Sequence, residues 1–332
     1  MPKVSVILPF YQAGTTLERA VRSVMGQTFS NWECLLVDNN STDGGEKIAR
    51  QYAAKDRRFR LLTEKNQGVV HAFYRGEQEA RGVYVARMDA DDWAHPKRIE
   101  KQLAWLEAHP ETGAVATQVE YVAHHNNTDG FARFVQWNNS LLTYEQIWLN
   151  RFVELPLVNP TAMWRKDLAE KLGSYRAGNF PEDYEMWLRW MEAGIRVDKL
   201  PEKLLYWHDS DTRLTRTHQI YSDEAFFRIK SHYLSNWLRR YQHHKRIYVW
   251  GASRISRKRV EKLEAEGITV ESFIDIKQSR QLERPVLFYE DLPEPGTLFI
   301  LVYMKLQKAR EKIQAFLHER DYIEGKDYLL VA

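Results

Sequence analysis

The sequence predicts an α/β protein with an open, mostly parallel sheet flanked by helices, followed by a second and smaller α/β unit. Short apolar runs alternate with segments of helical period up to Val122, which is typical of strand–helix repeats around a parallel sheet. The same alternation starts afresh at Arg246. We therefore expect a large domain at 1–215, a helical connector at 216–245 and a small α/β domain at 246–332.

The elements of the large domain are expected in strand-then-helix order. An uninterrupted apolar run predicts the first strand at 4–8, and apolar residues with helical spacing predict the first helix at 17–24. The same patterns predict strands at 34–37, 60–62, 83–88 and 114–122, and helices at 45–54, 69–80, 97–108 and 183–191. Ligands of such sheets bind beyond the carboxyl ends of the strands, so we expect a site at that edge.

The small domain has its own strand and helix patterns. Strands are predicted at 246–250, 269–274, 298–302 and 328–331, and helices end near 266 and 320. The turn after its first strand has Gly251 alone where a dinucleotide fingerprint needs three glycines, although Asp275 ends the next strand as that fingerprint requires. We expect a degenerate Rossmann-like domain used for packing, self-association or acceptor placement; a working nucleotide site is the alternative.

Composition narrows the class of protein. With 48 basic and 45 acidic residues, the net charge of +3 is too small for bulk nucleic-acid binding, so no nucleic-acid partner is expected. The single Cys34 lies in an apolar run and excludes an internal disulfide, which is typical of a cytoplasmic protein. No apolar run has membrane-spanning length. The basic segment 239–246 suggests peripheral contact with the inner face of a membrane, or only a solvated charge run.

Three carboxylates follow the predicted strand 83–88: Asp89, Asp91 and Asp92. Because neighbouring carboxylates repel and raise one another's pKa, this segment predicts a bound cation. Oxygen ligands suit Mg²⁺ or Mn²⁺, and such an ion often carries a diphosphate. The alternative is an acidic loop that caps the next helix.

Four blocks in order carry a resemblance to a known family: VSVILPFY at 4–11, LVDNNSTD at 36–43, ARMDADD at 86–92 and PEDYEMWLR at 181–189. They resemble glycosyltransferase family 2, the inverting enzymes that use nucleotide sugars and have a GT-A fold. The resemblance covers about two-thirds of the chain. It implies a Rossmann-like mixed sheet flanked by helices, and metal-dependent transfer of a sugar to a hydroxyl of a glycan or lipid-linked saccharide.

The resemblance assigns the nucleotide to Pro9, Tyr11 and Asp38. An aspartate can accept an N–H of the base, and a tyrosine ring offers a flat face for stacking. The alternative for Asp38 is an Asx-turn in the run that follows it. Uridine is the commonest base in the family, so a UDP-sugar is the favoured donor.

The diphosphate and its metal are assigned to the next group of residues. Asp91 is implied as a metal ligand, and Asp89 as a ligand of the metal or the ribose. Arg87 would add positive charge near the phosphates, with a surface salt bridge as the alternative. His208 stands where relatives keep a histidine that meets the metal or diphosphate; the alternative is a structural histidine.

Glu182 and Asp183 resemble the family's ED pair, whose aspartate acts as general base. One base and one displacement invert the anomeric centre, so an α-linked donor would give a β-linked product. The alternative for Asp183 is a first-turn acid that stabilises its helix. Arg213 and Arg216 would close over the phosphates, or be solvated charges.

The block 159–164 resembles the family's acceptor-side strand, so the resemblance implies that the acceptor binds there. Trp164 would stack on a sugar ring, and the alternative is a core tryptophan. The Gln-x-x-Arg-Trp motif of processive relatives does not occur in this sequence, so we expect one sugar added per binding event. Two other functions are weighed: a nucleotidyltransferase acting on sugar phosphates, which would need a glycine-rich loop with a lysine, and a non-catalytic sugar-nucleotide binding protein. A homo-oligomer through the small domain is a further expectation.

Overall fold

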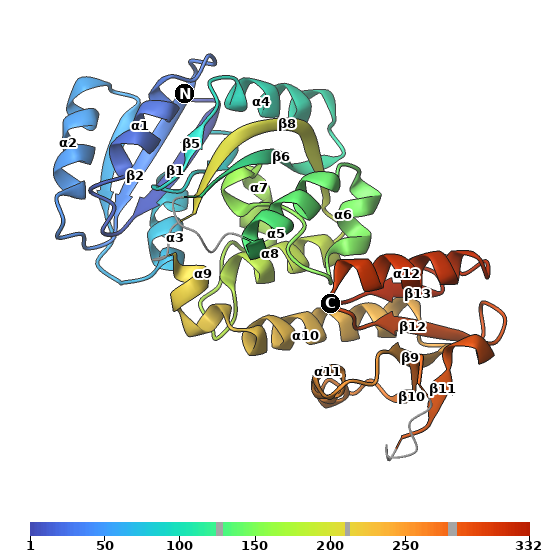
Figure 1. Cartoon of the computed structure of the whole chain (residues 1–332). Helices are drawn as coiled ribbons and strands as arrows, with labels where there is room; N and C mark the ends of the chain where they lie inside the picture. The colour runs from blue at the N-terminus through green and yellow to red at the C-terminus, as the bar shows by residue number, and fades with distance from the viewer. Residues whose placement is uncertain (124–128, 210–212, 278–283) are drawn as a thin grey trace. The chain divides into compact units, whose positions relative to one another are not determined.

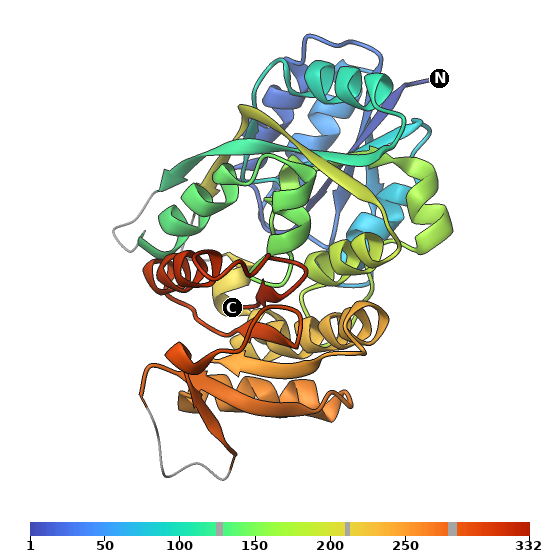
Figure 2. The ribbon, with the colours of Figure 1, turned by 90° about the vertical axis from the view of Figure 1, so that its right-hand side faces the viewer.

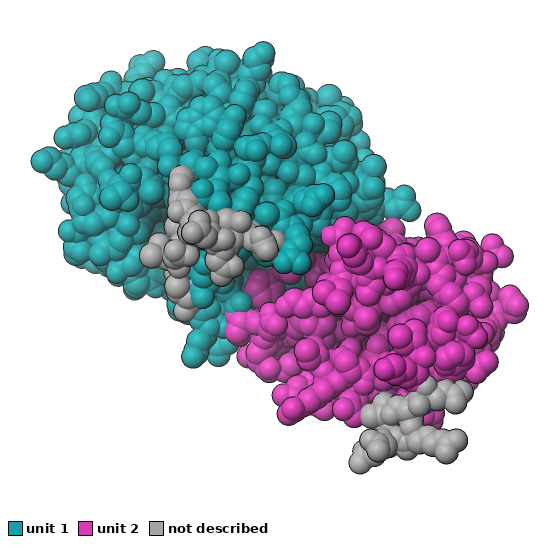
Figure 3. All heavy atoms as spheres, viewed as in Figure 1, with its two compact units in different colours: residues 1–147, 157–221 teal, residues 148–156, 222–332 magenta. Residues whose placement is uncertain are grey.

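The computed structural model describes residues 1–123, 129–209, 213–277 and 284–332. The chain divides into two compact units (Figure 3). Unit 1 comprises 1–147 and 157–221, and unit 2 comprises 148–156 and 222–332.

Unit 1 contains an eight-stranded mixed sheet in the order β3-β2-β1-β4-β7-β6-β8-β5. Its strands are β1 (Val4–Phe10), β2 (Trp32–Asp38), β3 (Phe59–Thr63), β4 (Tyr84–Arg87), β5 (Trp93–Ala94), β6 (Thr112–Ala123), β7 (Met163–Arg165) and β8 (Arg196–Asp209). Strands β1 to β4 pair in parallel, whereas β7 runs antiparallel to both β4 and β6. The sheet is therefore mixed, as the family resemblance implies. Figure 1 shows β6 and β8 side by side as two long, bent strands.

Helices cover both faces of this sheet. They are α1 (Leu17–Met25), α2 (Gly45–Lys55), α3 (Val69–Glu79), α4 (Arg98–Ala108), α5 (Asp129–Ser140), α6 (Tyr144–Asn150), α7 (Lys166–Leu172), α8 (Glu182–Glu192) and α9 (Leu214–Thr217). Alternate β1 residues face opposite sides: Val6 and Leu8 join the core under α1, whereas Ile7 faces α3. A Cβ atom at Gly76 of α3 would lie 2.6 Å from Ile7 Cγ2, so a glycine lets α3 approach the sheet.

Unit 2 contains a five-stranded parallel sheet in the order β11-β10-β9-β12-β13. Its elements are α10 (Asp223–Tyr241), β9 (Arg246–Trp250), α11 (Arg254–Ala265), β10 (Val270–Asp275), β11 (Val286–Phe288), β12 (Leu298–Val302), α12 (Gln307–His318) and β13 (Tyr328–Leu330). Figure 2 shows α11 and α12 on opposite faces of this sheet. The second Rossmann-like α/β sheet expected from the sequence is therefore present.

Among the residues that the structure describes, no helix combines the length and the apolar character that a membrane span requires.

Candidate active site

An acidic cluster lies just beyond the carboxyl end of β4. Carboxylate oxygens of Asp89, Asp91 and Asp92 lie within 4.8 Å of one another. Burial raises the pKa of Asp91, with the charge of Asp89 adding to the effect, and burial and the charge of Asp91 raise the pKa of Asp92 well above its usual range. The cluster therefore carries more negative charge than its surroundings stabilise.

Asp92 is a buried member of this cluster and not a helix cap. Its Oδ1 accepts a hydrogen bond of 2.9 Å from the backbone N–H of His208, which ties β8 to the cluster. Its Oδ2 is buried without a hydrogen-bond partner among the described residues. The N-cap of α4 is instead Lys97. A buried carboxylate oxygen with no donor, beside two other carboxylates, is the donor set that a hard divalent cation requires.

Arg87 is the last residue of β4 and is held inside unit 1. Its Nε donates a hydrogen bond of 2.8 Å to Asp89 Oδ1, and its side chain is only 6% exposed. The guanidinium packs against the rings of Phe73 and Tyr175. Burial opposes its charge, but the carboxylate of Asp89 raises the pKa of Arg87 above its usual value. A surface salt bridge is therefore excluded, and Arg87 fixes the position of Asp89.

Glu182 and Asp183 begin α8 and lie within electrostatic reach of this cluster. Burial and the neighbouring Glu182 carboxylate raise the pKa of Asp183 to about 7, and the charges of Arg87 and Asp89 also act on it. The Asp183 Oδ1 accepts a 2.7 Å hydrogen bond from the backbone N–H of Tyr184. The pair thus lies at the same end of unit 1 as the acidic cluster, although it is about 90 residues away in the sequence.

Tyr221 is a site residue that the sequence analysis missed. Its hydroxyl donates to Glu182, at 3.0 Å from Oε1 and 2.8 Å from Oε2. Burial raises the pKa of Glu182 even though this hydrogen bond favours the carboxylate. Tyr221 lies in a short 3₁₀ turn, Gln219–Tyr221, and no local sequence pattern connects that turn to α8.

The predicted residues at the end of β8 and just after it, His208, Arg213 and Arg216, differ in their contacts. The backbone carbonyl of His208 accepts a 2.7 Å hydrogen bond from Arg213, whose guanidinium lies 4.2 Å from the Trp207 ring centroid. The charge of Arg213 lowers the pKa of both Asp91 and Asp92, although burial outweighs it. Arg213 therefore lies near the acidic cluster. His208 contacts Asp92 of this cluster through its backbone N–H.

Arg216 has a different environment. Its Nη2 lies 2.5 Å from Oδ2 of Asp209, a fully buried carboxylate at the end of β8. The same oxygen accepts a hydrogen bond of 2.6 Å from the hydroxyl of Tyr121. Arg216 is therefore ion-paired within unit 1, so it is not a free solvated charge.

The residues predicted to hold a nucleotide meet at the carboxyl ends of β1 and β2. Phe10 of β1 pairs with Asp38 of β2, so the adjoining Pro9 and Tyr11 lie beside that aspartate in the sheet. Asp38 is buried, and its Oδ1 accepts a 3.1 Å hydrogen bond from the N–H of Ser41, which is three residues on and therefore not the two-residue Asx-turn named as the alternative. Tyr11 is 54% exposed and offers a free ring face.

Trp164 has no exposed face, so the expectation that it stacks on a sugar is wrong. The residue is 0% exposed, and its ring packs edge-on against Trp187 at 6.0 Å and Trp190 at 5.9 Å between centroids. The rings form part of the core between β7 and α8. Trp164 is therefore a core tryptophan, as the alternative prediction had it, because β7 and α8 both bury apolar side chains here.

Trp164→Ala is expected to lower the free energy of unfolding by about 3–5 kcal/mol, the usual cost of truncating a buried tryptophan. Urea denaturation followed by circular dichroism measures this change. Tyr74→Ala is the matched control, because that ring is 51% exposed and its loss should cost about 0.5 kcal/mol or less. A Trp164→Ala protein of unchanged stability that loses acceptor affinity would contradict the core assignment.

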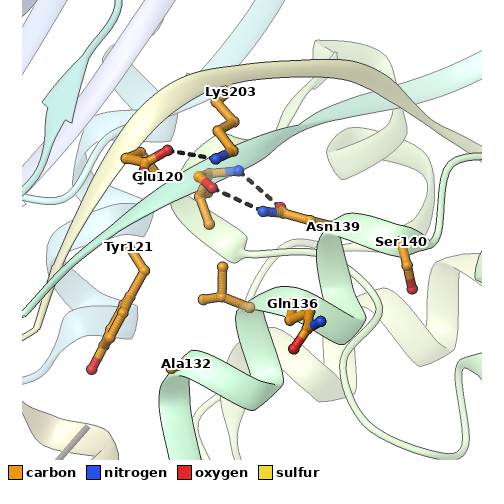
Figure 4. A pocket seen from close by; sticks show the side chains of 9 residues that line it. Glu120, Tyr121, Ala132, Gln136, Asn139, Ser140 and Lys203 are labelled. Atoms are coloured by element: carbon orange, nitrogen blue, oxygen red, sulfur yellow. Dashed lines mark hydrogen bonds and ion pairs between the residues drawn. The ribbon is translucent and has the colours of Figure 1, made fainter. Parts of the chain in front are cut away.

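A cavity of about 420 Å³ between β6, β8 and α5 was not predicted from the sequence (Figure 4). An ion pair between Glu120 and Lys203 lies at 2.6 Å on its wall. Asn139 of α5 exchanges two hydrogen bonds with the backbone of Val119, at 3.0 Å and 2.9 Å. The lining is mainly apolar and also contains amide, hydroxyl and charged groups that could bind hydroxyls of a ligand.

Comparison with known proteins identifies the family. Residues 5–173 match the family Glycosyl transferase family 2, which is half of the chain. The chain belongs to glycosyltransferase family 2. Within this family, EpsE of Bacillus subtilis, named as a glycosyltransferase, is 32% identical over 221 residues, or 61% of this chain and 72% of EpsE.

Two solved structures of glycosyltransferases have a similar fold. TarS of S. aureus, in complex with UDP-GlcNAc, has a TM-score of 0.57 and 18% identity, covering 73% of each chain. The mannosyltransferase PcManGT of Pyrobaculum calidifontis, in complex with GDP-Man and Mn²⁺, has a TM-score of 0.52 and 20% identity over 80% of this chain and 69% of that one. The GT-A fold implied by the sequence is therefore confirmed for this family 2 glycosyltransferase.

Proposed function

We propose that this family 2 glycosyltransferase is a metal-dependent, inverting and non-processive enzyme. It would transfer one hexosyl or N-acetylhexosaminyl residue from a nucleotide-diphosphate sugar to a hydroxyl of a glycan or lipid-linked saccharide. The observation that carries this proposal is that Asp183, at the start of α8, lies close enough to Asp89 for the charge of Asp89 to act on it. The pKa of the Asp183 carboxyl is about 7. This supports the proposal that the DXD-like cluster and the Asp183 carboxylate act in one site.

The acidic cluster fits Mn²⁺ or Mg²⁺. Asp91 and Asp89 are the proposed ligands, with Asp92 behind them and the His208 ring as a further ligand. When bound, such an ion stabilises the negative charge of the departing nucleoside diphosphate. Arg87 fixes the orientation of Asp89 through its 2.8 Å hydrogen bond. Arg213 adds positive charge on the side of Trp207.

Asp183 is the proposed general base. An acceptor hydroxyl has a high pKa and must lose its proton as it attacks the anomeric carbon, and a carboxylate with a pKa of about 7 can accept that proton near neutral pH. Tyr221 holds Glu182 in place, and the negative charge of Glu182 helps to raise the pKa of Asp183. A single displacement opposite the leaving group inverts the anomeric carbon, so an α-linked donor gives a β-linked product.

The donor is proposed to be a UDP-sugar. Pro9, Tyr11 and Asp38 lie together at the ends of adjacent strands, where a base could stack on the exposed Tyr11 ring. The similar structures hold UDP-GlcNAc in TarS and GDP-Man with Mn²⁺ in PcManGT, which supports a nucleotide-sugar donor. A nucleotidyltransferase is not favoured, because the segment after β1 is not a glycine-rich loop with a lysine.

The basic segment 239–246 gives limited support to membrane contact. Lys245 is bound to Asp327 at 3.1 Å with a side chain 7% exposed, and Arg246 lies 3.2 Å from Glu271. These two charges are neutralised within unit 2. Peripheral membrane contact and self-association through unit 2 stay predictions, with liposome sedimentation and light scattering as their tests.

A thermal-shift panel tests the donor assignment. UDP-sugars are expected to raise the melting temperature with Mn²⁺ and much less without it, whereas GDP- and dTDP-sugars should give smaller shifts, because a specific donor stabilises by mass action. Incubation with the best donor and a saccharide acceptor should then release the nucleoside diphosphate. Metal-independent shifts of equal size for all donors would contradict the proposal.

Turnover is expected to rise as the pH increases through about 7, because Asp183 has a pKa of about 7 and accepts a proton only in its ionised form. The measurement is kcat at saturating donor and Mn²⁺ from about pH 5.5 to about pH 8.5, a range of about three pH units centred on that pKa. Glu192→Gln, a change at the far end of α8, should keep the same profile. A flat profile through this range would contradict the base assignment.

A further inference from the structure

The carboxyl edge of the unit 2 sheet contains a topological switch point. β10 and β11 lie on one side of β9, and β12 and β13 lie on the other, so α11 and α12 leave neighbouring strands toward opposite faces (Figure 1). Small ligands of open parallel sheets bind at such points. A dinucleotide is not favoured here, because Asp275 Oδ2 already accepts a hydrogen bond of 3.1 Å from Ala252 N–H in the first turn after β9.

Arg259 of α11 is a buried cation near this point. The residue is 7% exposed, and no hydrogen bond or ion pair to another described residue is found for its guanidinium. Its Cζ lies 3.8 Å from the ring centroid of Phe227, and its charge acts on Tyr303, which directly follows β12. No nitrogen of this guanidinium is fully buried without a partner, so its donors keep contact with solvent and an anion could reach them.

Three further cations gather around Arg259. Lys230 Nζ lies 4.3 Å from the same Phe227 ring and donates a hydrogen bond of 2.9 Å to the carbonyl of Val153. Arg310 donates to the Ala332 carbonyl, beside the Val331 carbonyl that Lys230 also reaches. The third is Lys305, in the turn after β12.

Three acids act on these four cations in the described part of unit 2: Glu154, Asp223 and Glu311. Glu154 raises the pKa of Lys230 and of Arg310, and Asp223 lies 3.7 Å from Lys305. Burial still lowers the pKa of Lys230 to about 7, with the charges of Arg259 and Arg310 adding to the effect. The basic side chains therefore outnumber the acidic ones here, which favours binding of an anion such as phosphate.

We propose that unit 2 binds a phosphate-bearing small molecule at this switch point, with Arg259 as its central ligand and Lys230, Lys305 and Arg310 around it. The Glu154 carboxylate interacts with the same cations, Lys230 and Arg310, and competes with the phosphate for them. The exposed first turn of α11 and the exposed Lys305 side chain border the site on the solvent side. This proposal does not depend on the sugar-transfer activity of unit 1.

Calorimetric titration of the full chain with inorganic phosphate tests this site. The experiment uses the Asp91→Ala background with a chelator, so that metal-dependent donor binding cannot contribute. Saturable binding is expected, with acetate binding at least about tenfold more weakly because it has one charge. Arg259→Gln should weaken phosphate binding about tenfold or more, the scale of a lost charge-assisted hydrogen bond. The exposed Arg257→Gln on the same helix is the control and should bind as the parent does.

Glu154→Gln gives a test of opposite sign that does not depend on the folding of the Arg259 variant. Removing the competing carboxylate should tighten phosphate binding by about threefold or more. Absence of saturable binding, equal losses for Arg257→Gln and Arg259→Gln, or an unchanged affinity for Glu154→Gln would each overturn the proposal. Retained sugar transfer in Arg259→Gln with Asp91 intact would show that the two sites are separate.

Discussion

Asp183→Asn is expected to lower kcat by about 10²-fold or more while the dissociation constant of the donor stays within about twofold. The amide keeps the shape of the side chain and its position at the start of α8, but it cannot accept the proton of the acceptor hydroxyl. The donor binds through the acidic cluster and the ends of β1 and β2, so its affinity should not change. Steady-state kinetics and a donor titration by calorimetry measure the two quantities separately.

Stability separates this effect from unfolding. The folded-state pKa of Asp183, about 7, is above its usual value, so the folded protein loses stability as the pH rises from the usual carboxyl range to about 7, and this loss is complete above pH 7. The Asp183→Asn protein cannot ionise at this position. At pH 8, about one unit above this pKa, it should therefore melt at the same temperature as the native protein or at a higher one. Glu192→Gln is the control on the same helix and should retain normal turnover. An Asp183→Asn enzyme with native kcat would eliminate the proposed base.

Asp91→Ala is expected to abolish Mn²⁺-dependent binding of the donor. Asp91 lies between Asp89 and Asp92, and the carboxylate oxygens of the three residues lie within 4.8 Å of one another. Its loss removes a hard oxygen ligand and lowers the negative charge that attracts the ion. Titration of the donor with and without Mn²⁺ measures the effect, and turnover should fall with binding.

The matched control for this variant is Asp167→Ala. Asp167 is an exposed acid of α7 whose carboxylate pairs with Lys171 at 2.7 Å, so its loss should leave metal and donor binding unchanged. The expected result requires a folded protein, which circular dichroism verifies. Full Mn²⁺-dependent donor affinity in the Asp91→Ala protein would exclude the acidic cluster as the metal site.

The parts of the fold that the sequence predicts are those with continuous local patterns. β1 and β2 are uninterrupted buried strands, and α1 and α3 repeat apolar residues with helical spacing. The acidic cluster was predictable because its three carboxylates lie within four residues, directly after β4. Pro9, Tyr11 and Asp38 were likewise predictable as neighbours, because they lie at the ends of two adjacent strands, β1 and β2.

The parts that local patterns do not predict depend on contacts far apart in the chain. β8 contains the buried Lys199, whose Nζ is satisfied by the Asn138 carbonyl at 2.6 Å and its side-chain oxygen at 2.9 Å. A lysine in this position hides the strand pattern, because polar residues normally indicate an exposed segment. Likewise, Tyr221 reaches Glu182 across 39 residues, and nothing near either residue signals that hydrogen bond.

The most direct test of the central claim is a crystal structure of the protein with Mn²⁺ and a nucleoside diphosphate, with the ion located by its anomalous scattering. The claim predicts one Mn²⁺ bound by Asp91 and Asp89 together with the diphosphate, with the Asp183 carboxylate facing the position that the donor sugar would occupy. The claim would be contradicted by an ion bound elsewhere in unit 1. It would also be contradicted by a diphosphate whose sugar-bearing end points away from Asp183.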